Sequence, residues 1–267
     1  MRIRLHFSVF ITFVLLFVAV SAEAKKQETG FLDRSVVVQG TSYKYEVYLP
    51  EDWTPKQKWP VILFLHGAGE RADDGMFQTQ VGIGKGIREH RDRFPAIVVL
   101  PQCRKDRWWA QSPMDDEAIA ALEAATKEFN GDKNRTYLTG LSMGGYGTWH
   151  LAGKYPGRFA AIAPICGGVL MPDVSRLQQA SDTSPYTDAA KKIGGKTPTW
   201  IFHGGDDPVV PVAESQRMNE AMKALGGDVH YTEYPGVGHD SWTKAYDDAD
   251  FIKWMLSKSL SGNTAAK

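Results

Sequence analysis

Cysteine is scarce in this sequence, since Cys103 and Cys166 are the only two in 267 residues. Two cysteines allow a single disulfide bond, and the sequence alone does not decide whether that bond forms. The seven histidines and the two cysteines do not cluster with the spacing of metal ligands. We therefore expect neither a metal nor another cofactor.

Net charge is also absent, because 31 lysines and arginines balance 31 aspartates and glutamates. No basic stripe or acidic tail indicates nucleic acid as a partner. Internal repeats, long low-complexity segments and interdomain linkers are missing as well. With 43% hydrophobic and 23% charged residues, the composition is that of a soluble globular protein, and the length suits one α/β domain.

The long apolar run of this chain lies at its N-terminus. Arg2 and Arg4 precede an apolar stretch, residues 7–20, and Ala22-Glu23-Ala24 follows as a small-x-small cleavage pattern. This arrangement predicts a secretory signal peptide over residues 1–24. The alternative is an uncleaved membrane anchor, but the apolar stretch is shorter than the ~20 residues that a span prefers. We expect a secreted or periplasmic protein without stable membrane association after cleavage.

The remaining residues, 25–267, are expected to form a single domain in which apolar, β-branched runs alternate with amphipathic ones. The predicted strands are 35–40 and 43–50 as an opening antiparallel pair, then 60–67, 96–102, 135–141, 159–165, 197–204 and 229–235. The predicted helices are 114–129, 143–154, 212–225 and 247–258, followed by a frayed tail at 261–267. This alternation predicts a mostly parallel sheet covered by helices on both faces. Ligands of such sheets bind at the carboxyl ends of the strands.

A G-x-S-x-G pentapeptide, Gly140-Leu141-Ser142-Met143-Gly144, lies where a predicted strand gives way to a helix. A strand–turn–helix of this kind holds a nucleophilic serine in a strained backbone conformation. Small residues two positions before and after Ser142 relieve the steric conflict. The pentapeptide alone also fits a plain glycine-rich turn. A nucleophile therefore requires a base, an acid and an oxyanion site elsewhere in the chain.

Two backbone amides are candidates for an oxyanion hole. The N–H of Met143 opens the helix after the serine, where the helix dipole favours negative charge. The glycine-rich turn that begins at His66 follows a buried strand, and we expect Ala68 to supply the second N–H. Such donors are typically worth ~2.7–4 kcal/mol each. We expect His66 itself to be structural, because the turn uses its backbone.

The acid and the base are predicted from two further strand ends. The segment 200–211, "WIFHGGDDPVVP", carries two adjacent carboxylates after a strand. We predict that Asp207 orients the catalytic histidine, with Asp206 as the alternative. His239 follows the last predicted strand and a glycine-containing loop, and is predicted to be the general base. The order Ser, Asp, His along the chain is that of the α/β-hydrolase fold.

These motifs together resemble a known family. "HGAGER", "GLSMGGYGTW", "HGGDDPVVP" and "YPGVGHDSW" are similar to the α/β-hydrolase esterases of the phospholipase/carboxylesterase or "predicted peptidase" group, which is related to dienelactone hydrolases and feruloyl-type esterases. The resemblance covers nearly all of the chain after the signal peptide. Dienelactone hydrolases carry a nucleophilic cysteine, whereas this chain has Ser142 at that position. The resemblance therefore implies a serine esterase with the α/β-hydrolase fold, and the short segment 168–196 predicts that no large cap domain is inserted.

The resemblance also implies a strand order, and with it a separation of the two cysteines. In the hydrolase sheet, two strands lie between those that end near Cys103 and Cys166. Three strand steps of about 4.8 Å amount to roughly 14 Å, whereas a disulfide needs Cα atoms within about 7 Å. Two separate buried thiols are therefore favoured, and a disulfide would need the loops to bend toward each other.

The substrate pocket is less well defined by the sequence. The segment 168–196, where many hydrolases insert a cap domain, is short, which predicts at most a small lid over an open cleft. Trp108 and Trp109 follow a strand end, and Trp242 follows the predicted base closely, so these three are candidate substrate contacts. Packing in the core or on the surface is the alternative for each. Glu70 and Arg71 are expected to lock the oxyanion loop by ion pairing.

The function predicted from these features is an exported serine esterase acting on small-molecule or polymer-attached esters, including bulky or carbohydrate-linked ones. One rival is a serine peptidase, because prolyl-oligopeptidase catalytic domains resemble the "GGY" segment after the serine. Those enzymes need a second domain to restrict access, and none is evident here. A second rival is a non-catalytic secreted binding protein on the same fold, which would be expected to have a broken triad.

Overall fold

A computed structural model describes residues 28–171, 182–194 and 196–265. The signal peptide expected at residues 1–24 lies outside these residues. Within them, no helix combines the length and the apolar character needed to cross a membrane.

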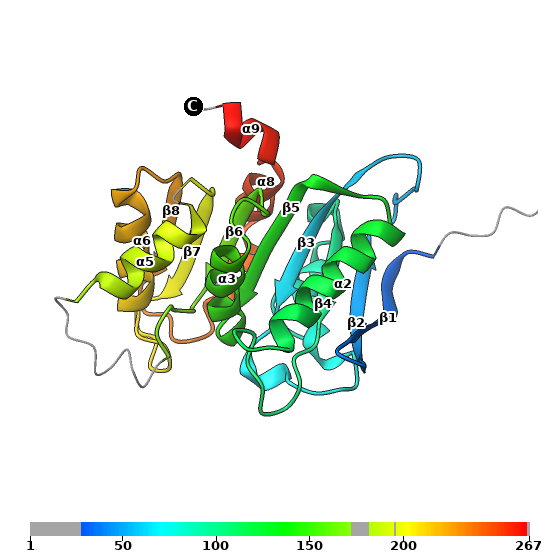
Figure 1. Cartoon of the computed structure of the whole chain (residues 1–267), viewed down its shortest axis with the longest axis horizontal. Coiled ribbons are helices and arrows are strands. Elements are labelled where there is room, and N and C mark those ends of the chain that lie inside the picture. The colour runs from blue at the N-terminus through cyan, green and yellow to red at the C-terminus, as the bar shows by residue number, and fades with distance from the viewer. Residues whose placement is uncertain (1–27, 172–181, 195, 266–267) are drawn as a thin grey trace, which may run out of the picture.

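The described residues contain one eight-stranded sheet with the strand order β1-β2-β4-β3-β5-β6-β7-β8 (Figure 1). β1 pairs with β2, and β2 with β4, in antiparallel fashion, and the remaining neighbours pair in parallel. The strands are β1 Gly30–Val38, β2 Thr41–Leu49, β3 Trp59–Leu65, β4 Ile97–Pro101, β5 Gly131–Leu141, β6 Ala161–Ile165, β7 Thr199–Gly204 and β8 Val229–Tyr234. The predicted antiparallel opening pair and mostly parallel sheet are confirmed.

Helices cover both faces of the sheet, and α2, α3 and α5 lie in front of it in Figure 1. The α-helices are α1 Ile83–Glu89, α2 Met114–Glu128, α3 Met143–Lys154, α5 Ser184–Ile193, α6 Ala213–Ala224, α7 Trp242–Asp247, α8 Ala249–Leu256 and α9 Leu260–Ala265. Short 3-10 helices occur at η1 Ala68–Glu70, η2 Phe77–Thr79 and η3 Arg91–Arg93.

The sheet divides the core into two apolar clusters. Successive side chains of β3 point alternately into one cluster and the other. All seven residues of β3 are buried. Leu63 belongs to the cluster shared with α2, α3, α5 and α6, whereas Phe64 belongs to the cluster shared with α1, α7 and α8. A strand that is apolar on both sides therefore forms because each side meets a helical layer. Because the central strands pair in parallel, their carboxyl ends lie at one edge of the sheet.

Two predicted elements differ from the structure at the C-terminus. The single helix predicted over 247–258 is broken at Asp248, whose backbone is extended. Its side chain accepts the Asp250 N–H at 2.9 Å and so caps a new helix, α8, which sequence periodicity alone does not reveal. The tail predicted to be frayed from residue 261 instead contains α9. The Ser259 hydroxyl accepts the N–H of Gly262 at 3.0 Å at the start of that helix.

The two cysteines lie apart, as the strand order implied. β3 and β5 separate β4 from β6, and both Cys103 and Cys166 are buried free thiols. Between β6 and β7, the described residues contain one helix, α5. This helix packs its buried Tyr186, Ala190 and Ile193 into the cluster shared with α3 and α6.

Candidate active site

Ser142 lies in a tight turn between β5 and α3, as the pentapeptide predicted. Its φ of 51° and ψ of −117° are unusual for a residue with a side chain. The flanking glycines are required by close backbone approaches. A Cβ on Gly140 would lie 2.4 Å from the Gly144 carbonyl oxygen, and one on Gly144 would lie 1.8 Å from that of Leu65. The turn therefore tolerates only glycine at these two positions.

Three predicted side chains meet at the carboxyl edge of the sheet. His239 Nε2 lies 2.9 Å from Ser142 Oγ, and His239 Nδ1 lies 2.7 Å from Asp207 Oδ2. Asp207 follows β7 and His239 follows β8, so parallel pairing of these strands brings the two loops together. The alternative acid, Asp206, is exposed, whereas Asp207 is the carboxylate that contacts His239, so the geometry favours Asp207.

The Asp207 carboxylate is held by four hydrogen bonds. Oδ1 accepts the backbone N–H groups of Val209 and Val210 at 2.8 and 3.0 Å, and Oδ2 faces His239 and His203 at 2.7 and 3.2 Å. Burial would raise the pKa of Asp207, but the hydrogen bonds from His203, His239 and the two amides lower it well below its usual value. The side chain, which has no exposed surface, therefore stays ionised.

His203 is a member of this network that the sequence did not identify. Its side chain is fully buried at the end of β7, with Nδ1 2.6 Å from Ser215 Oγ and Nε2 3.1 Å from the Val210 carbonyl oxygen. The sequence shows only that a strand ends at this histidine. The one available signal was its position four residues before Asp207, on a strand end shared with the acid.

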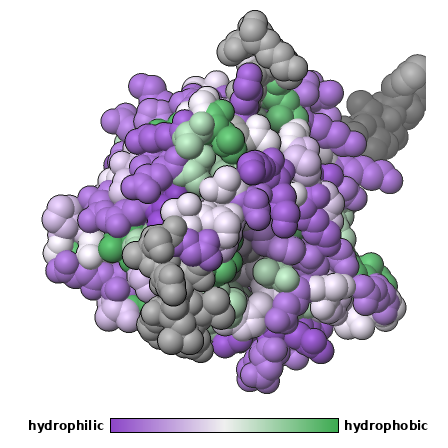
Figure 2. All heavy atoms as spheres, turned by 60° about the vertical axis from the view of Figure 1, so that its left-hand side comes forward, coloured by the Kyte–Doolittle hydropathy of each residue, from purple (hydrophilic) through white to green (hydrophobic). Residues whose placement is uncertain are grey.

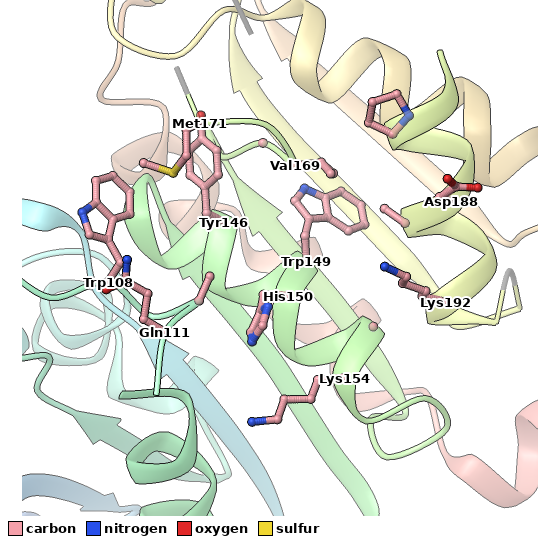
Figure 3. Close-up of a pocket in the computed structure, with 15 residues that line it drawn as sticks. Trp108, Gln111, Tyr146, Trp149, His150, Lys154, Val169, Met171, Asp188 and Lys192 are labelled. Carbon is pink, nitrogen blue, oxygen red and sulfur yellow. The ribbon is translucent and has the colours of Figure 1, made fainter. Parts of the chain in front are cut away.

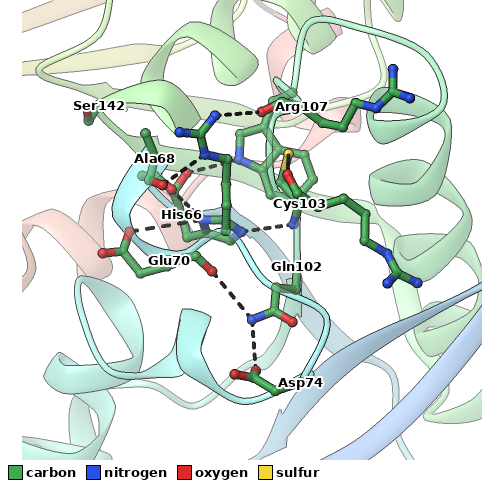
Figure 4. A network of polar contacts seen from close by, with 12 residues as sticks. His66, Ala68, Glu70, Asp74, Gln102, Cys103, Arg107 and Ser142 are labelled. Atoms are coloured by element: carbon green, nitrogen blue, oxygen red, sulfur yellow. Dashed lines mark hydrogen bonds and ion pairs between the residues drawn. The ribbon is translucent and has the colours of Figure 1, made fainter.

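The turn expected to carry the second oxyanion donor packs directly against the nucleophile turn (Figure 4). A Cβ on Gly67 would lie 2.9 Å from a Leu141 methyl and 3.7 Å from the Ser142 Cβ. Ala68 begins η1 immediately after this contact, and Met143 is buried at the start of α3. The two predicted donors therefore belong to turns that touch each other beside Ser142.

Neutral polar contacts fix the backbone of this turn. The Cys103 N–H donates to His66 Nε2 at 2.9 Å, so the His66 proton resides on Nδ1, 2.6 Å from the Gly67 carbonyl oxygen. Burial lowers the pKa of His66 to about 4, which keeps its ring uncharged. Trp109 Nε1 donates to the His66 carbonyl oxygen at 2.9 Å. His66 is therefore structural, as expected.

The predicted ion pair between Glu70 and Arg71 is wrong. Arg71 instead donates to the backbone carbonyl oxygens of Ala68, at 2.9 Å, and Arg107, at 3.3 Å. Glu70 Oε2 lies 4.0 Å from His66 Nδ1 and has no hydrogen-bond partner. Arg71 still holds the loop in place, but through two backbone carbonyl oxygens. Its guanidinium group can bind both because it carries several N–H donors.

The three tryptophans predicted to contact substrate differ in their surroundings. Trp109 has no exposed surface and packs edge-on against His66 at 5.1 Å, so the expectation that it forms a cleft wall is wrong. Trp108 is partly exposed and meets Tyr146 edge-on at 6.2 Å. Trp242, also partly exposed, meets the His239 ring edge-on at 5.3 Å. Of the two adjacent tryptophans, Trp109 therefore packs in the core and Trp108 lies at the surface.

A cleft of about 670 Å³ runs along α3 (Figure 3). Tyr146, Trp149, His150 and Lys154 line it from successive turns of that helix, and Trp108 stands at the Tyr146 end. Its volume is within the range of small-molecule sites, about 300–1,000 Å³. Figure 2 shows that the face carrying α5 and α6 is otherwise mainly hydrophilic, with only small apolar patches.

The structure also brings together a cysteine, an aspartate and a histidine that are far apart in the sequence. Donor atoms of Cys166, Asp207 and His239 lie within 4.8 Å of one another, an arrangement that could hold a metal ion. Asp207 and His239 are already hydrogen-bonded to each other. Burial raises the pKa of Cys166 to about 12, so its thiol stays protonated. The contacts within this group are therefore those of a hydrogen-bonded triad with a thiol beside it.

Comparison with known proteins assigns the family. Residues 37–252 match the family model Esterase, described as "Putative esterase". This match spans most of the chain, which therefore belongs to that family, and the predicted resemblance is confirmed. Family and fold together place the matched region among the carboxylic ester hydrolases with an α/β-hydrolase fold.

Two proteins described as esterases and one secreted protein are among those similar to this chain. Feruloyl esterase B of Thermothelomyces thermophilus is 25% identical, over 94% of this chain and 92% of its own length. An uncharacterized secreted protein of Arthroderma benhamiae is 26% identical, over 73% of this chain but only 23% of that protein. The crystal structure of a thermostable esterase matches with a TM-score of 0.72 and 33% identity, over 86% of this chain and 63% of the solved one.

Proposed function

We propose that this chain is a serine esterase that hydrolyses carboxylic esters through an acyl-enzyme intermediate. Ser142 is the nucleophile, His239 the general base and acid, and Asp207 the acid that orients His239. The observation that carries the proposal is the continuous hydrogen-bonded line from Asp207 Oδ2 through both nitrogens of His239 to Ser142 Oγ. Asp207 accepts the hydrogen bond from the Nδ1–H of His239, so His239 Nε2 is free to take the serine proton.

The reaction follows from this line of atoms. His239 Nε2 takes the proton of Ser142 Oγ while that oxygen attacks the ester carbonyl carbon and forms a tetrahedral intermediate. The intermediate collapses as the bond to the alcohol oxygen breaks and His239 returns the proton to that oxygen. Water then attacks the acyl-enzyme with His239 again as base, which releases the carboxylic acid and restores Ser142.

The oxyanion of both tetrahedral intermediates is assigned to the N–H groups of Ala68 and Met143. Met143 is the first residue of α3, so its amide has no partner within the helix and lies at the positive end of the helix dipole. Ala68 opens η1 in the turn packed against the nucleophile turn. Fixed backbone donors need no reorganisation as charge develops on the carbonyl oxygen.

The substrates proposed are bulky esters, including aryl and carbohydrate-linked ones. The support is the cleft along α3, which is lined by Trp108 and by Tyr146, one helical turn after Ser142, while the triad side chains lie outside its lining. Trp242 beside His239 is proposed to contact the leaving group. A relative that matches over nearly its whole length is named feruloyl esterase B. This name supports the proposal that the acyl group of the substrate is aromatic.

Export through a cleaved N-terminal signal peptide is part of the proposal. Its support is the charged, apolar and small-x-small order of residues 1–24, together with a relative described as a secreted protein. Expression with a C-terminal tag, followed by N-terminal sequencing of the exported protein, should give Lys25 as the first residue. Recovery of the protein with Met1 intact in the membrane fraction would rule out cleavage.

Replacement of Ser142 by Ala tests the proposed function most simply. Loss of the nucleophile in a triad costs about 10⁶-fold in kcat, so p-nitrophenyl acetate hydrolysis should be abolished while circular dichroism is unchanged. Ser35, an exposed serine of β1, gives the matched control Ser35→Ala, which should keep full activity. Retained turnover in Ser142→Ala would remove the serine from the mechanism.

A substrate panel separates the finer alternatives. Acetyl, butyryl, longer acyl and hydroxycinnamoyl esters should all be cleaved by the wild type and none by Ser142→Ala. We expect the hydroxycinnamoyl ester to have the highest kcat/KM, because an aromatic acyl group can pack on Trp108. A preference for an amide over its matching ester would instead indicate a peptidase.

A further inference from the structure

Two imidazole rings approach the same carboxylate oxygen in the proposed triad. His239 Nδ1 lies 2.7 Å from Asp207 Oδ2, and His203 Nε2 lies 3.2 Å from that oxygen. The other oxygen, Oδ1, already accepts two backbone N–H groups, from Val209 and Val210. Any change in how His203 binds Oδ2 therefore bears directly on the hydrogen bond that orients His239.

The partners of His203 define where its proton lies. Nε2 faces two acceptors, Asp207 Oδ2 at 3.2 Å and the Val210 carbonyl oxygen at 3.1 Å, and neither can donate, so Nε2 must carry the hydrogen. Nδ1 lies 2.6 Å from the hydroxyl of Ser215, which can donate to it. A proton on Nε2 satisfies both acceptors, which select this tautomer, and the Ser215 hydroxyl, which can donate or accept, completes the contacts of the ring at Nδ1.

We propose that His203 is a positioning residue for catalysis, and this rests on the triad proposed above. It donates from Nε2 to Asp207 Oδ2, fixes the carboxylate in the plane that His239 needs, and takes up part of the negative charge that would otherwise face His239. The ring is fully buried at the end of β7, and Ser215 on α6 holds its other nitrogen. The strand β7 and the helix α6 thus fix the position of Asp207, which itself lies in a loop.

Other titratable groups around the pair keep one charge state near neutral pH. Cys166 and Tyr146 lie within electrostatic reach of Asp207, and burial raises the pKa of both well above neutrality. Glu233 on β8 lies within electrostatic reach of His203, and its pKa is lowered, first by the hydrogen bond from Tyr231. The charges of these groups do not change near neutral pH. A shift in the acid limb of the pH–activity profile therefore reports the Asp207–His239 pair.

The test compares His203→Phe, which keeps a ring but has no donor, with His203→Gln, whose amide can donate near the position of Nε2. For p-nitrophenyl acetate, His203→Phe should lower kcat about 10- to 100-fold, the loss expected for one hydrogen bond to a charged group. KM should change little. The acid limb of the kcat/KM profile should move to higher pH, because the undivided charge on Oδ2 favours protonated His239.

His203→Gln should restore most of kcat and return the acid limb toward its wild-type position. His230→Phe is the matched control, since His230 lies on the neighbouring strand β8 but is exposed, and its contacts, an ion pair with Asp228 at 3.6 Å and ring packing on Trp200 and Trp254, lie outside the Asp207 network. That control should behave as the wild type. Ser215→Ala removes the partner of Nδ1 and should move the acid limb in the same direction as His203→Phe by a smaller amount.

An unmoved acid limb in a folded His203→Phe enzyme, or no rescue by Gln, would overturn the proposal and leave His203 with a packing role only. If His203→Phe melts below the assay temperature, Ser215→Ala carries the test, and an unmoved acid limb in that variant would overturn the proposal. Failure here is distinguishable from failure of the proposed function. Ser142→Ala would still be inactive if only the role of His203 were wrong, and would stay active if the triad itself were wrong.

Discussion

Two buried carboxyl groups near the site, Asp207 and Glu117, show how differently its two halves are built. Asp207 receives four hydrogen bonds, which lower its pKa and keep it ionised. Glu117 on α2 is fully buried beside Gln102 and Arg104 of the segment after β4, and neither of its oxygens has a hydrogen bond of standard geometry. Burial raises the pKa of Glu117 well above its usual value.

The contrast extends to the surrounding residues. On the acid–base side, a charge is kept in the core because donors converge on it from β7, from the loop after β8 and from the loop between Asp207 and Val210. On the oxyanion side, hydrogen bonds to the backbone hold a turn in place: His66 is uncharged, and Trp109 and Arg71 donate to carbonyl oxygens of the turn. The first half should respond to changes in charge and pH, and the second to changes in shape.

The largest effect is expected from Asp207→Asn, which removes the charge but nearly keeps the shape. An amide cannot stabilise the imidazolium that forms at His239 and favours the wrong tautomer. Such a change lowers kcat by about 10⁴-fold in serine hydrolases. Steady-state kinetics on p-nitrophenyl acetate measure it, with Asp206→Asn as the matched control that should retain activity. Equal loss in both variants would mean that Asp207 has no special role.

An intermediate effect is expected from Trp109→Phe on the oxyanion side. The His66 carbonyl oxygen loses its donor, which should cost about 1–3 kcal/mol in the free energy of unfolding. A shift of the Ala68 turn by about 1 Å can cost up to about 10²-fold in kcat. The pH profile of activity should keep its shape, because no charge changes. Trp108→Phe serves as the control for stability, and a displaced acid limb in Trp109→Phe would contradict the division into halves.

The smallest effect on activity is expected from Glu117→Gln, whose consequence is for stability. Because the folded pKa is raised, the unfolded chain ionises first, and the wild type loses stability as pH rises above about 4.3. Glu117→Gln lacks this loss, so it should be more stable than the wild type at pH 7, and the difference should vanish below about pH 4. Chemical denaturation at both pH values checks this, with the exposed Glu123→Gln as a flat control.

Much of the fold and the chemical centre could be predicted because their signals are local. Apolar runs predict β3 to β8 in order, and steric demands at Gly140 and Gly144 mark the nucleophile turn within five residues. Chain order then distinguishes His239 from the other histidines. Each of these inferences depends on residues close in sequence or on the rule that parallel strands share a carboxyl edge.

The remaining features depend on contacts between distant segments. Trp108 and Trp109 are equivalent in the sequence, yet Trp108 is partly exposed, whereas Trp109 is fully buried and donates to the His66 carbonyl oxygen. His203 gains its place from Ser215 on α6 and from the loop of Asp207. The break at Asp248 depends on a single cap. Sequence periodicity carries no signal for such partners.

The central claim is that Ser142, activated through His239 by Asp207, forms the covalent intermediate. The most direct measurement is peptide mass mapping after treatment with a fluorophosphonate probe. We expect one probe per chain on Ser142, labelling slowed in parallel with kcat in Asp207→Asn, and none in Ser142→Ala. Ester turnover by an enzyme that the probe leaves unmodified at Ser142, or labelling at another residue that abolishes activity, would contradict the account.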